Sequence, residues 1–306
     1  MKNLEILIEN YLTFCQKQKC LDKKTIKAYR IDLKQFRLGI SSNDITEIKA
    51  ETLEEYIALL HTDFKPKTAK RKIASLKAFF HYLEYKDIIT INPFHKIQIR
   101  FREPITLPKI IPLNTIESLL KTMYKQYAYA KTHCQKRNTL RDIAVIELLF
   151  ATGIRISELC TIKVSNIDLH EKTLLIYGKN SKERLLQIGN DDVNNILQEY
   201  KREYQAEINQ YSYFFISHSN TPLSDQAVRR IINKYTSLAA IDLHITPHMF
   251  RHTFATSLLE ADVDIRYIQE MLGHSSINIT EIYTHVTLAK QRDILTSKHP
   301  RKTLNV

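Results

Sequence analysis

Residues 245–256 read Ile-Thr-Pro-His-Met-Phe-Arg-His-Thr-Phe-Ala-Thr, and this stretch combines a helix start with two side chains suited to phosphate. Thr246 followed by Pro247 predicts a cap and a first helical turn, because threonine caps helices and proline is tolerated at the first helical position. His248 and Arg251 stand three residues apart, so they share one face of this helix. Helix N-termini favour phosphate, and a guanidinium adds a planar fork for its oxygens. The stretch therefore predicts a helical, phosphate-binding region.

A metal site is the alternative for the same stretch, since His248 and His252 are four residues apart. The zinc motif with this spacing carries a glutamate directly after the first histidine, whereas Met249 stands at that position. The sequence also contains no P-loop and no carboxylate cluster. We therefore expect neither a metal nor another cofactor.

The sequence around this stretch has mainly helical periodicity. Helices are expected near 114–131, 140–152, 192–204, 224–238, 247–260, 265–272 and 277–283. Two β-rich runs, 173–177 and 184–188, are joined by the turn-prone residues 178–182 and predict a hairpin. The second part of the chain is thus expected to be mainly α, with a small antiparallel β-sheet.

The first hundred residues predict a bundle of helices near 4–14, 22–39, 52–60 and 66–85. The last of these helices has an apolar side and a basic side. The basic side comprises Lys67, Lys70, Arg71, Lys72 and Lys77. Such residues form either a solvated face or a set of phosphate contacts, and the second interpretation makes them candidate DNA-binding residues.

Three of the eight prolines fall within nine residues, at Pro104, Pro108 and Pro112. Proline disfavours helix in the residue before it, so this segment predicts an extended connection. The expected organisation is a first domain over 1–100, a linker over 101–112 and a second domain over 113–306.

The chain of 306 residues carries a formal net charge of +12, which suggests a polyanionic partner, most commonly nucleic acid. Residues 1–105 hold 20 Lys and Arg against 13 Asp and Glu, so the first domain is the more basic part. An anionic membrane surface is less favoured because the chain has no tryptophan and no long basic amphipathic helix. No apolar run approaches the roughly 20 residues that span a bilayer, and acidic residues interrupt the N-terminus, so we expect a cytoplasmic protein.

Glycine is scarce, with five in the whole chain, and three of them lie beside candidate active residues. These pairs are Gly153 with Arg155, Gly178 with Lys179, and Gly273 with His274. Glycine permits turns and close backbone approach that other residues do not. A geometric reason is therefore expected at each of these positions.

The order of these motifs carries a family resemblance. Ala151-Thr-Gly-Ile-Arg-Ile-Ser-Glu-Leu159 is followed by Gly178-Lys179, the His248–Arg251 pair, Leu272-Gly-His274 and finally Tyr283. This series resembles the tyrosine recombinase (phage integrase) family over nearly the whole chain. The closest likeness is to Xer-like recombinases and to the compact recombinases encoded by transposons. The resemblance implies a helical-bundle, SAM-like core-binding domain followed by a mixed, mainly α catalytic domain.

The resemblance also implies that the protein cuts and rejoins DNA strands through a transient bond between a phosphate and Tyr283. A phenol has an ordinary pKa near 10 and needs activation at neutral pH. Arg155 and Arg251 would bind the non-bridging oxygens, where charge accumulates. His274 would donate a further hydrogen bond to the phosphate.

Proton transfer is assigned to the remaining residues in the same way. His248 would accept the tyrosine proton, and Lys179 would protonate the departing 5′-oxygen. The turn Gly-Lys-Asn-Ser-Lys differs from the family's commoner Gly-Lys-Gly, so Lys182 remains the competitor of Lys179. Glu158, one helical turn after Arg155, resembles the family's acidic residue that orients the site.

The implied partner is double-stranded DNA carrying an inverted-repeat recombination site. Members of this family act as tetramers on two paired sites and exchange strands through a Holliday junction, either as homotetramers or together with a second recombinase. The tail 287–306 contains Leu288, Ile294 and Leu295 among basic residues. It is expected to dock on a neighbouring subunit, and a flexible basic tail is the alternative.

Several functions remain open at this stage. Cointegrate resolution and chromosome-dimer resolution are favoured, because the chain leaves no room for an additional arm-binding domain. Integration or excision of a mobile element is the alternative within the same chemistry, and a type IB topoisomerase would share it. The alternative of a different class is a sequence-specific DNA-binding regulator that lacks catalysis, although no catalytic position is missing.

Overall fold

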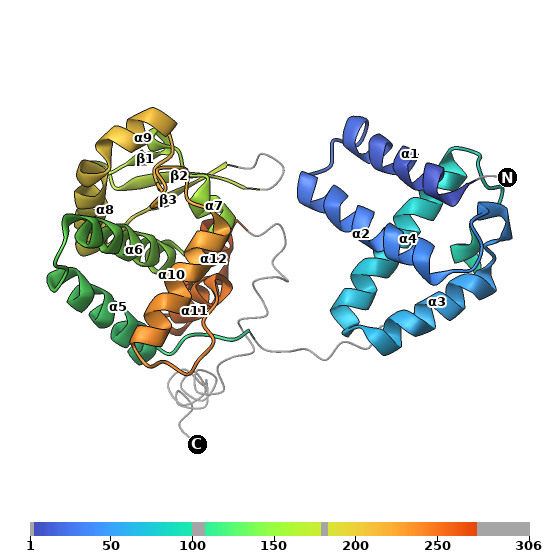
Figure 1. Cartoon of the computed structure of the whole chain (residues 1–306). Helices are drawn as coiled ribbons and strands as arrows, with labels where there is room; N and C mark the ends of the chain where they lie inside the picture. Colours follow the sequence, from blue (N-terminus) through green and yellow to red (C-terminus); the bar gives the residue numbers. More distant parts are fainter. Residues whose placement is uncertain (1–2, 100–107, 179–182, 274–306) are drawn as a thin grey trace, which may run out of the picture. The chain divides into compact units, whose positions relative to one another are not determined.

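Amphipathic helices build most of the chain (Figure 1). The computed structural model describes residues 3–99, 108–178 and 183–273. The chain divides into two units, Met1–Ile105 and Thr106–Val306, each with its own apolar core. Among the described residues, none of the helices has both the length and the apolar character needed to cross a membrane.

The first unit contains four long helices and two short 3₁₀ turns. They are α1 (Leu4–Lys17), α2 (Lys23–Gly39), η1 (Ile45–Glu47), α3 (Ala50–Asp63), α4 (Pro66–Tyr85) and η2 (Pro93–Lys96). Asp22 caps α2 by accepting a hydrogen bond from Lys24 N at 2.7 Å. Phe36, Phe79 and Phe80 are fully buried and pack edge to face. The predicted helical bundle is confirmed.

A buried polar cluster joins α2 to α4 inside this unit. The Asp32 carboxylate is 2% exposed and accepts hydrogen bonds from Ser75 Oγ at 2.8 Å and Lys72 Nζ at 3.4 Å. Arg71 also pairs with Asp32, and Lys72 donates to Gln35. A charge can be buried when it is paired and hydrogen-bonded, so Asp32 accounts for the presence of two cations at this helix contact.

This cluster corrects one expectation about the basic side of α4. Lys72 is 3% exposed and lies in the interior, so it is not part of an exposed face. Its position in the helix, between the buried Ala69 and Leu76, brings it to the edge of the apolar stripe, where Asp32 can neutralise it. The other predicted residues, Lys67, Lys70, Arg71 and Lys77, are exposed on α4.

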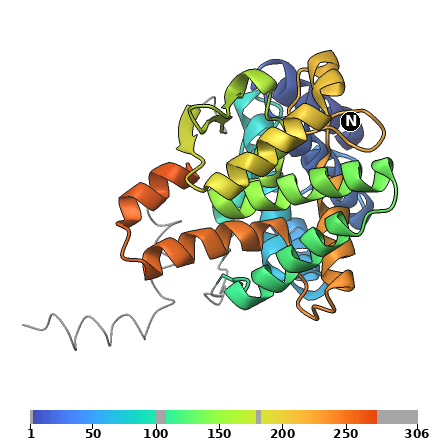
Figure 2. The same ribbon diagram turned by 90° about the vertical axis from the view of Figure 1, so that its left-hand side faces the viewer.

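The second unit combines eight helices with a small sheet in its described residues. Its elements are α5 (Leu113–Ala128), α6 (His133–Thr152), α7 (Ile156–Cys160), η3 (Val164–Asn166), β1 (Ile167–Asp168), β2 (Thr173–Tyr177), β3 (Glu183–Gln187), α8 (Asp191–Glu203), α9 (Gln205–Tyr211), α10 (Asp225–Leu238), α11 (Pro247–Glu260) and α12 (Ile265–Leu272). Helix α6 is central and packs against α5, α8 and α11 (Figure 1 and Figure 2). Its residues 139–149 are all buried, which explains why its apolar periodicity is weak.

The three strands form an antiparallel sheet in the order β1-β2-β3. Leu174 and Ile176 of β2 are buried, and they pair with Leu186 and Arg184 of β3. The predicted hairpin is therefore confirmed, with the second strand beginning one residue earlier than expected. Arg184 occupies an inward position between apolar residues, which requires partners for its charge.

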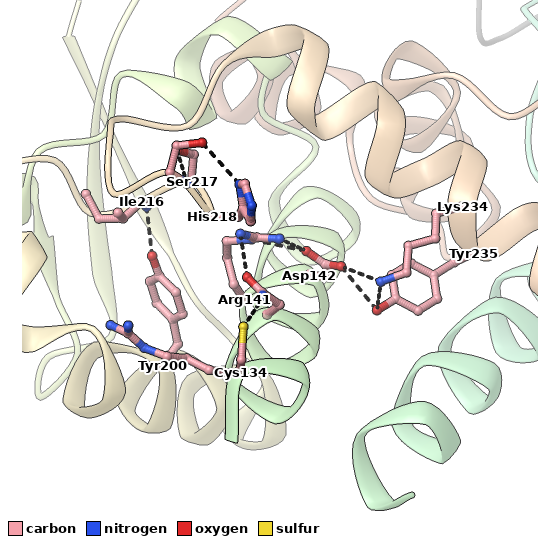
Figure 3. A network of polar contacts seen from close by, with 12 residues as sticks. Cys134, Arg141, Asp142, Tyr200, Ile216, Ser217, His218, Lys234 and Tyr235 are labelled. Atoms are coloured by element: carbon pink, nitrogen blue, oxygen red, sulfur yellow. Dashed lines mark hydrogen bonds and ion pairs between the residues drawn. The ribbon is translucent and has the colours of Figure 1, made fainter. Parts of the chain in front are cut away.

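A second buried carboxylate ties α6 to α10 (Figure 3). Asp142 accepts two hydrogen bonds from the neighbouring Arg141, at 2.6 and 3.1 Å, through one oxygen. Its other oxygen accepts from Lys234 Nζ at 3.2 Å and Tyr235 Oη at 3.1 Å. This pairing fixes the helix that ends at Thr152, directly before the candidate site.

The main differences from the expected elements are short or lie at segment ends. Helices α7 and α9 and strand β1 were not predicted, because five, seven and two residues are too few to show a periodicity. The expected linker is described only from residue 108 onward. There, Ile111 is buried and its N–H donates to Thr253 Oγ1 of α11 at 2.8 Å. The predicted helix 277–283 and the tail 287–306 lie outside the described residues.

Candidate active site

Arg155 is placed by a tight turn between α6 and α7. Helix α6 ends at Gly153, whose φ of +59° lies in the left-handed region that favours glycine. A Cβ on this residue would come within 2.6 Å of the Phe254 ring, so the turn also needs glycine for the approach of α11. Arg155 follows as the N-terminal cap of α7, with its side chain 32% exposed. The sequence expectation for Gly153 therefore has a geometric basis.

Glu158 holds Arg155 in place. One carboxylate oxygen accepts from Arg155 N and the other from Arg155 Nη1, both at 2.8 Å. Arg184 of β3 donates to the same two oxygens, at 2.8 and 3.1 Å. Burial alone would raise the pKa of Glu158, but the hydrogen bonds and charges of Arg184 and Arg155 hold the pKa below its ordinary value. Glu158 is thus a carboxylate at neutral pH.

Arg251 lies on α11 and is 4% exposed. Its Nη1 donates to the Gly153 carbonyl at 2.9 Å and its Nη2 to the Leu272 carbonyl at 2.6 Å. The guanidinium therefore connects the end of α6 to the end of α12. Both carbonyls belong to helix C-termini, where carbonyl groups lack intrahelical partners and carry partial negative charge.

These contacts close into one ring. Arg155 bonds to Glu158, Glu158 to Arg184, and Arg184 Nε donates to the Met271 carbonyl at 2.8 Å. The next carbonyl along α12, that of Leu272, accepts a hydrogen bond from Arg251. Arg251 also donates to the Gly153 carbonyl, in the turn that precedes Arg155. We call these four residues, Arg155, Glu158, Arg184 and Arg251, the arginine ring. The ring holds three guanidinium groups and one carboxylate: Arg155 and Arg184 bind Glu158, and Arg251 joins through backbone carbonyls. The positive charges outnumber the negative one, so the ring is suited to an anion such as a phosphate.

His248 lies beside the ring on the first turn of α11, and its side chain is open to solvent on one side and packed against the protein on the other. Partial burial, followed by the positive charges of Arg251, Arg229 and Arg155, lowers the pKa of His248 below its ordinary value. A lowered pKa leaves the imidazole neutral at pH 7, the form that can accept a proton. Its position near both predicted arginines agrees with the shared helix face inferred from the sequence.

His252, the partner in the alternative zinc interpretation, lies one turn further along α11. Burial, followed by the charges of His248 and Arg251, lowers the pKa of His252 to about 4. Within residues 3–99, 108–178 and 183–273, no group of three or more His, Cys, Asp or Glu side chains is arranged to hold a metal ion.

Four predicted site residues, Lys179, Lys182, His274 and Tyr283, lie outside the described residues. Gly273 directly precedes His274 and ends α12 with a φ of +64°. A Cβ there would meet Arg184 Nη1 at 3.0 Å, so glycine permits both the left-handed turn and the close approach of the guanidinium.

Sequence reasoning missed Arg184. The available signal was the alternation within the predicted strand, where a single arginine shares the inward face with Leu186 and Ile188. A charged residue at an inward strand position indicates a buried ion pair. The sequence could have signalled this need for a partner, but not that the partner is Glu158.

Comparison with known proteins shows the family. Residues 111–290 match the phage integrase family, and residues 8–86 match the phage integrase N-terminal SAM-like domain. A tyrosine recombinase of Agathobacter rectalis is 66% identical, with 99% of each chain covered. The XerD tyrosine recombinase of Listeria monocytogenes is 34% identical, covering 96% of this chain and 99% of the relative.

A solved structure shares the fold. The XerH site-specific recombinase, in a post-cleavage complex with its palindromic difH substrate, has a TM-score of 0.72 and 21% identity, covering 93% of this chain and 83% of the other. The chain belongs to the phage integrase family. It is an Xer-like tyrosine recombinase, a DNA-binding enzyme of site-specific recombination.

Proposed function

We propose that this recombinase cleaves a DNA strand by attack of the Tyr283 phenol oxygen on a backbone phosphate. The new bond joins the phenol oxygen to phosphorus, and the bond from phosphorus to the 5′-oxygen breaks. The products are a 3′-phosphotyrosine and a free 5′-hydroxyl. Reversal of the step by a 5′-hydroxyl from another strand reseals the backbone, and the energy of the broken bond is kept in the phosphotyrosine.

The observation that supports this proposal is the arginine ring. It fixes Arg155 and Arg251 around one turn through contacts between residues that are far apart in the sequence. In the transition state, negative charge grows on the non-bridging oxygens, and two guanidinium groups held in advance stabilise that charge without reorganising. His274 would add a third donor.

Proton transfers complete the step. His248, neutral at pH 7 because of its lowered pKa, would accept the proton of Tyr283. Lys179, or its competitor Lys182, would give a proton to the leaving 5′-oxygen. Glu158 would keep Arg155 oriented and would itself exchange no proton.

The cellular reaction that we propose is recombination between two inverted-repeat sites, held by four subunits and passing through a Holliday junction. Resolution of cointegrates or chromosome dimers is the favoured task. The likeness to a XerD recombinase, at 34% identity over nearly the whole chain, supports a resolution reaction of this kind. Exposed Lys67, Lys70 and Lys77 on α4 would contribute phosphate contacts from the first unit.

The test uses a duplex that the protein itself selects from a random-sequence library, nicked so that cleavage cannot be reversed. The wild-type protein should form an SDS-resistant adduct whose link maps to Tyr283. Tyr283→Phe should abolish the adduct while DNA binding persists. Tyr267→Phe, at an exposed tyrosine of α12, is the matched control and should retain it.

Arg155→Lys should also lose the adduct, because an ammonium cannot replace the planar fork. An adduct that persists in Tyr283→Phe, or that maps to another residue, would contradict the proposal. Specific binding by the wild-type protein without any adduct would instead identify a DNA-binding regulator.

A further inference from the structure

Arg184 has the contacts of a residue that organises the site. It lies on β3 opposite Ile176, and its side chain is 9% exposed. Burying a guanidinium is costly unless several of its N–H groups are bonded. Arg184 therefore depends on its partners, and its partners belong to two other elements.

The first partner is Glu158, which it grips with two parallel hydrogen bonds at 2.8 and 3.1 Å. The same carboxylate orients Arg155 through two further hydrogen bonds. With Arg184 absent, Glu158 would be free to turn away from Arg155, because half of its hydrogen bonds would be lost.

The second partner is the end of α12. Arg184 Nε donates to the Met271 carbonyl at 2.8 Å, and Gly273 leaves room for the guanidinium beside the last turn. The adjacent Leu272 carbonyl is held by Arg251. One planar side chain on the hairpin thus sets the position of both α7 and the C-terminal end of α12.

We infer that Arg184 is a positioning residue for DNA cleavage, acting through Glu158 on Arg155 and through Met271 on the end of α12. This inference rests on the proposed function, because Arg155 must act on the scissile phosphate. Lysine cannot take over the role, since a single ammonium cannot reach two carboxylate oxygens and a carbonyl in one plane.

The experiment measures single-turnover cleavage at saturating DNA, together with the DNA dissociation constant and the thermal unfolding midpoint. Arg184→Lys and Arg184→Gln are compared with Arg202→Lys and Arg202→Gln, at an exposed arginine of α8. The Arg184 variants should cleave about 100-fold more slowly, because a small misplacement of a catalytic group has this effect. The DNA dissociation constants of the Arg184 variants and of the Arg202 variants should equal that of the wild-type protein.

A second substrate distinguishes a misplaced Arg155 from a general loss of active-site structure. It carries a methyl group in place of one non-bridging oxygen of the scissile phosphate, which removes the charge that Arg155 would stabilise. On this substrate the cleavage rates of the Arg184 variants should be less than about tenfold below the wild-type rate. The reason is that Arg155, the group that these variants misplace, no longer has a charge to stabilise. Arg184→Gln and Glu158→Gln together should be no slower than the slower single variant, because both act on the same group.

The outcomes distinguish the inference from the function on which it rests. If wild-type protein forms no Tyr283 adduct, the proposed function fails and the inference falls with it. If the wild type cleaves but the Arg184 variants cleave normally, or are equally slow on both substrates, the function stands and the inference is overturned. The inference would also be overturned if the slowing disappeared at temperatures well below the unfolding midpoint of each variant, or if weaker DNA binding accounted for it.

Discussion

The two units of the chain each bury a carboxylate among cations, with different results. In the first unit, Asp32 lies between two helices of one bundle and pairs with Arg71 and Lys72. In the second, Glu158 accepts from Arg155 and Arg184, which stand in a turn and on a strand. The first cluster joins two long helices, whereas the second joins the ends of short elements.

The surroundings of the two carboxylates also differ. Ser75 and Gln35 complete the hydrogen bonds around Asp32, and Lys72 lies wholly inside. The additional partner of Glu158 is the backbone N–H of Arg155. A third guanidinium, that of Arg251, joins the ring through the carbonyls of Gly153 and Leu272. Each carboxylate contacts two cations, but the cations of Asp32 stand on one helix and fix its packing. The cations of Glu158 come from a turn and a strand and lie in a ring with the further guanidinium of Arg251, so this cluster is suited to hold an anion.

Neutralising each carboxylate is the strongest test of this comparison. Asp32→Asn and Glu158→Gln should each lower the free energy of unfolding by about 3 kcal/mol, because each leaves one buried cation, Lys72 or Arg184, without its carboxylate. Only Glu158→Gln should also slow single-turnover cleavage at saturating DNA, by about 100-fold, since Arg155 loses its orientation. Denaturant unfolding and suicide-duplex cleavage measure the two effects.

Equal slowing of cleavage by Asp32→Asn would show that the first cluster is not merely structural. Wild-type cleavage by Glu158→Gln would remove the reason for treating the second cluster as part of the site.

The next test concerns the pH dependence of stability that His252 of α11 should cause. Burial and neighbouring charge lower the pKa of His252 to about 4, whereas an unfolded histidine titrates near 6.5. Between these values the unfolded chain binds a proton that the folded chain excludes, so stability falls as the pH falls from about 6.5 to 4. At 1.36 kcal/mol per pH unit the loss attributable to His252 should stay below about 3 kcal/mol, because solvent screens the charge of a partly exposed ring.

Urea unfolding of wild-type protein and His252→Gln at pH 7 and pH 4.5 measures this contribution. The variant should lose less stability on acidification than the wild type. His248 has a pKa lowered in the same direction and remains in both proteins. An identical pH dependence in the two proteins would rule out a titrating His252.

The smallest expected effect concerns the basic side of α4. Lys70 is exposed and Lys72 is buried against Asp32, although the two are only two residues apart. If Lys70 contacts a phosphate, Lys70→Met should reduce the slope of log affinity against log salt by about one, because one fewer counterion is released. Lys72→Met should leave this slope unchanged and lower stability instead.

Fluorescence anisotropy with the selected duplex at several salt concentrations gives both slopes. A reduced slope for Lys72→Met would mean that this side chain leaves the interior on binding DNA.

Much of the fold could be read from local patterns. The bounds of α4, α11 and α12 follow from Pro66, Pro247 and Gly273 together with apolar periodicity, and the structure has the predicted limits. These signals are local, because proline, glycine and capping residues act within one turn of their own position. Elements of five or seven residues, such as α7 and α9, lack enough turns to produce such a pattern.

The candidate site was only partly predictable. Arg155, Glu158, His248 and Arg251 were identified by their order in the sequence, and the structure brings them together around one turn. Lys179, Lys182, His274 and Tyr283 remain predictions. Arg184 was missed because an inward-facing arginine signals that it needs a partner without naming one.

The amino-acid sequence by itself determined the helical character, the two-unit organisation, the basic charge and the residue types suited to a phosphate. Only the tertiary structure decided that Lys72 is buried, that Glu158 binds Arg184, and that Arg251 holds carbonyls of two helices. The physical reason is that the periodicity of a segment defines which of its faces is apolar. Packing between segments that are distant in the sequence decides which side chains contact that face and which polar groups become partners.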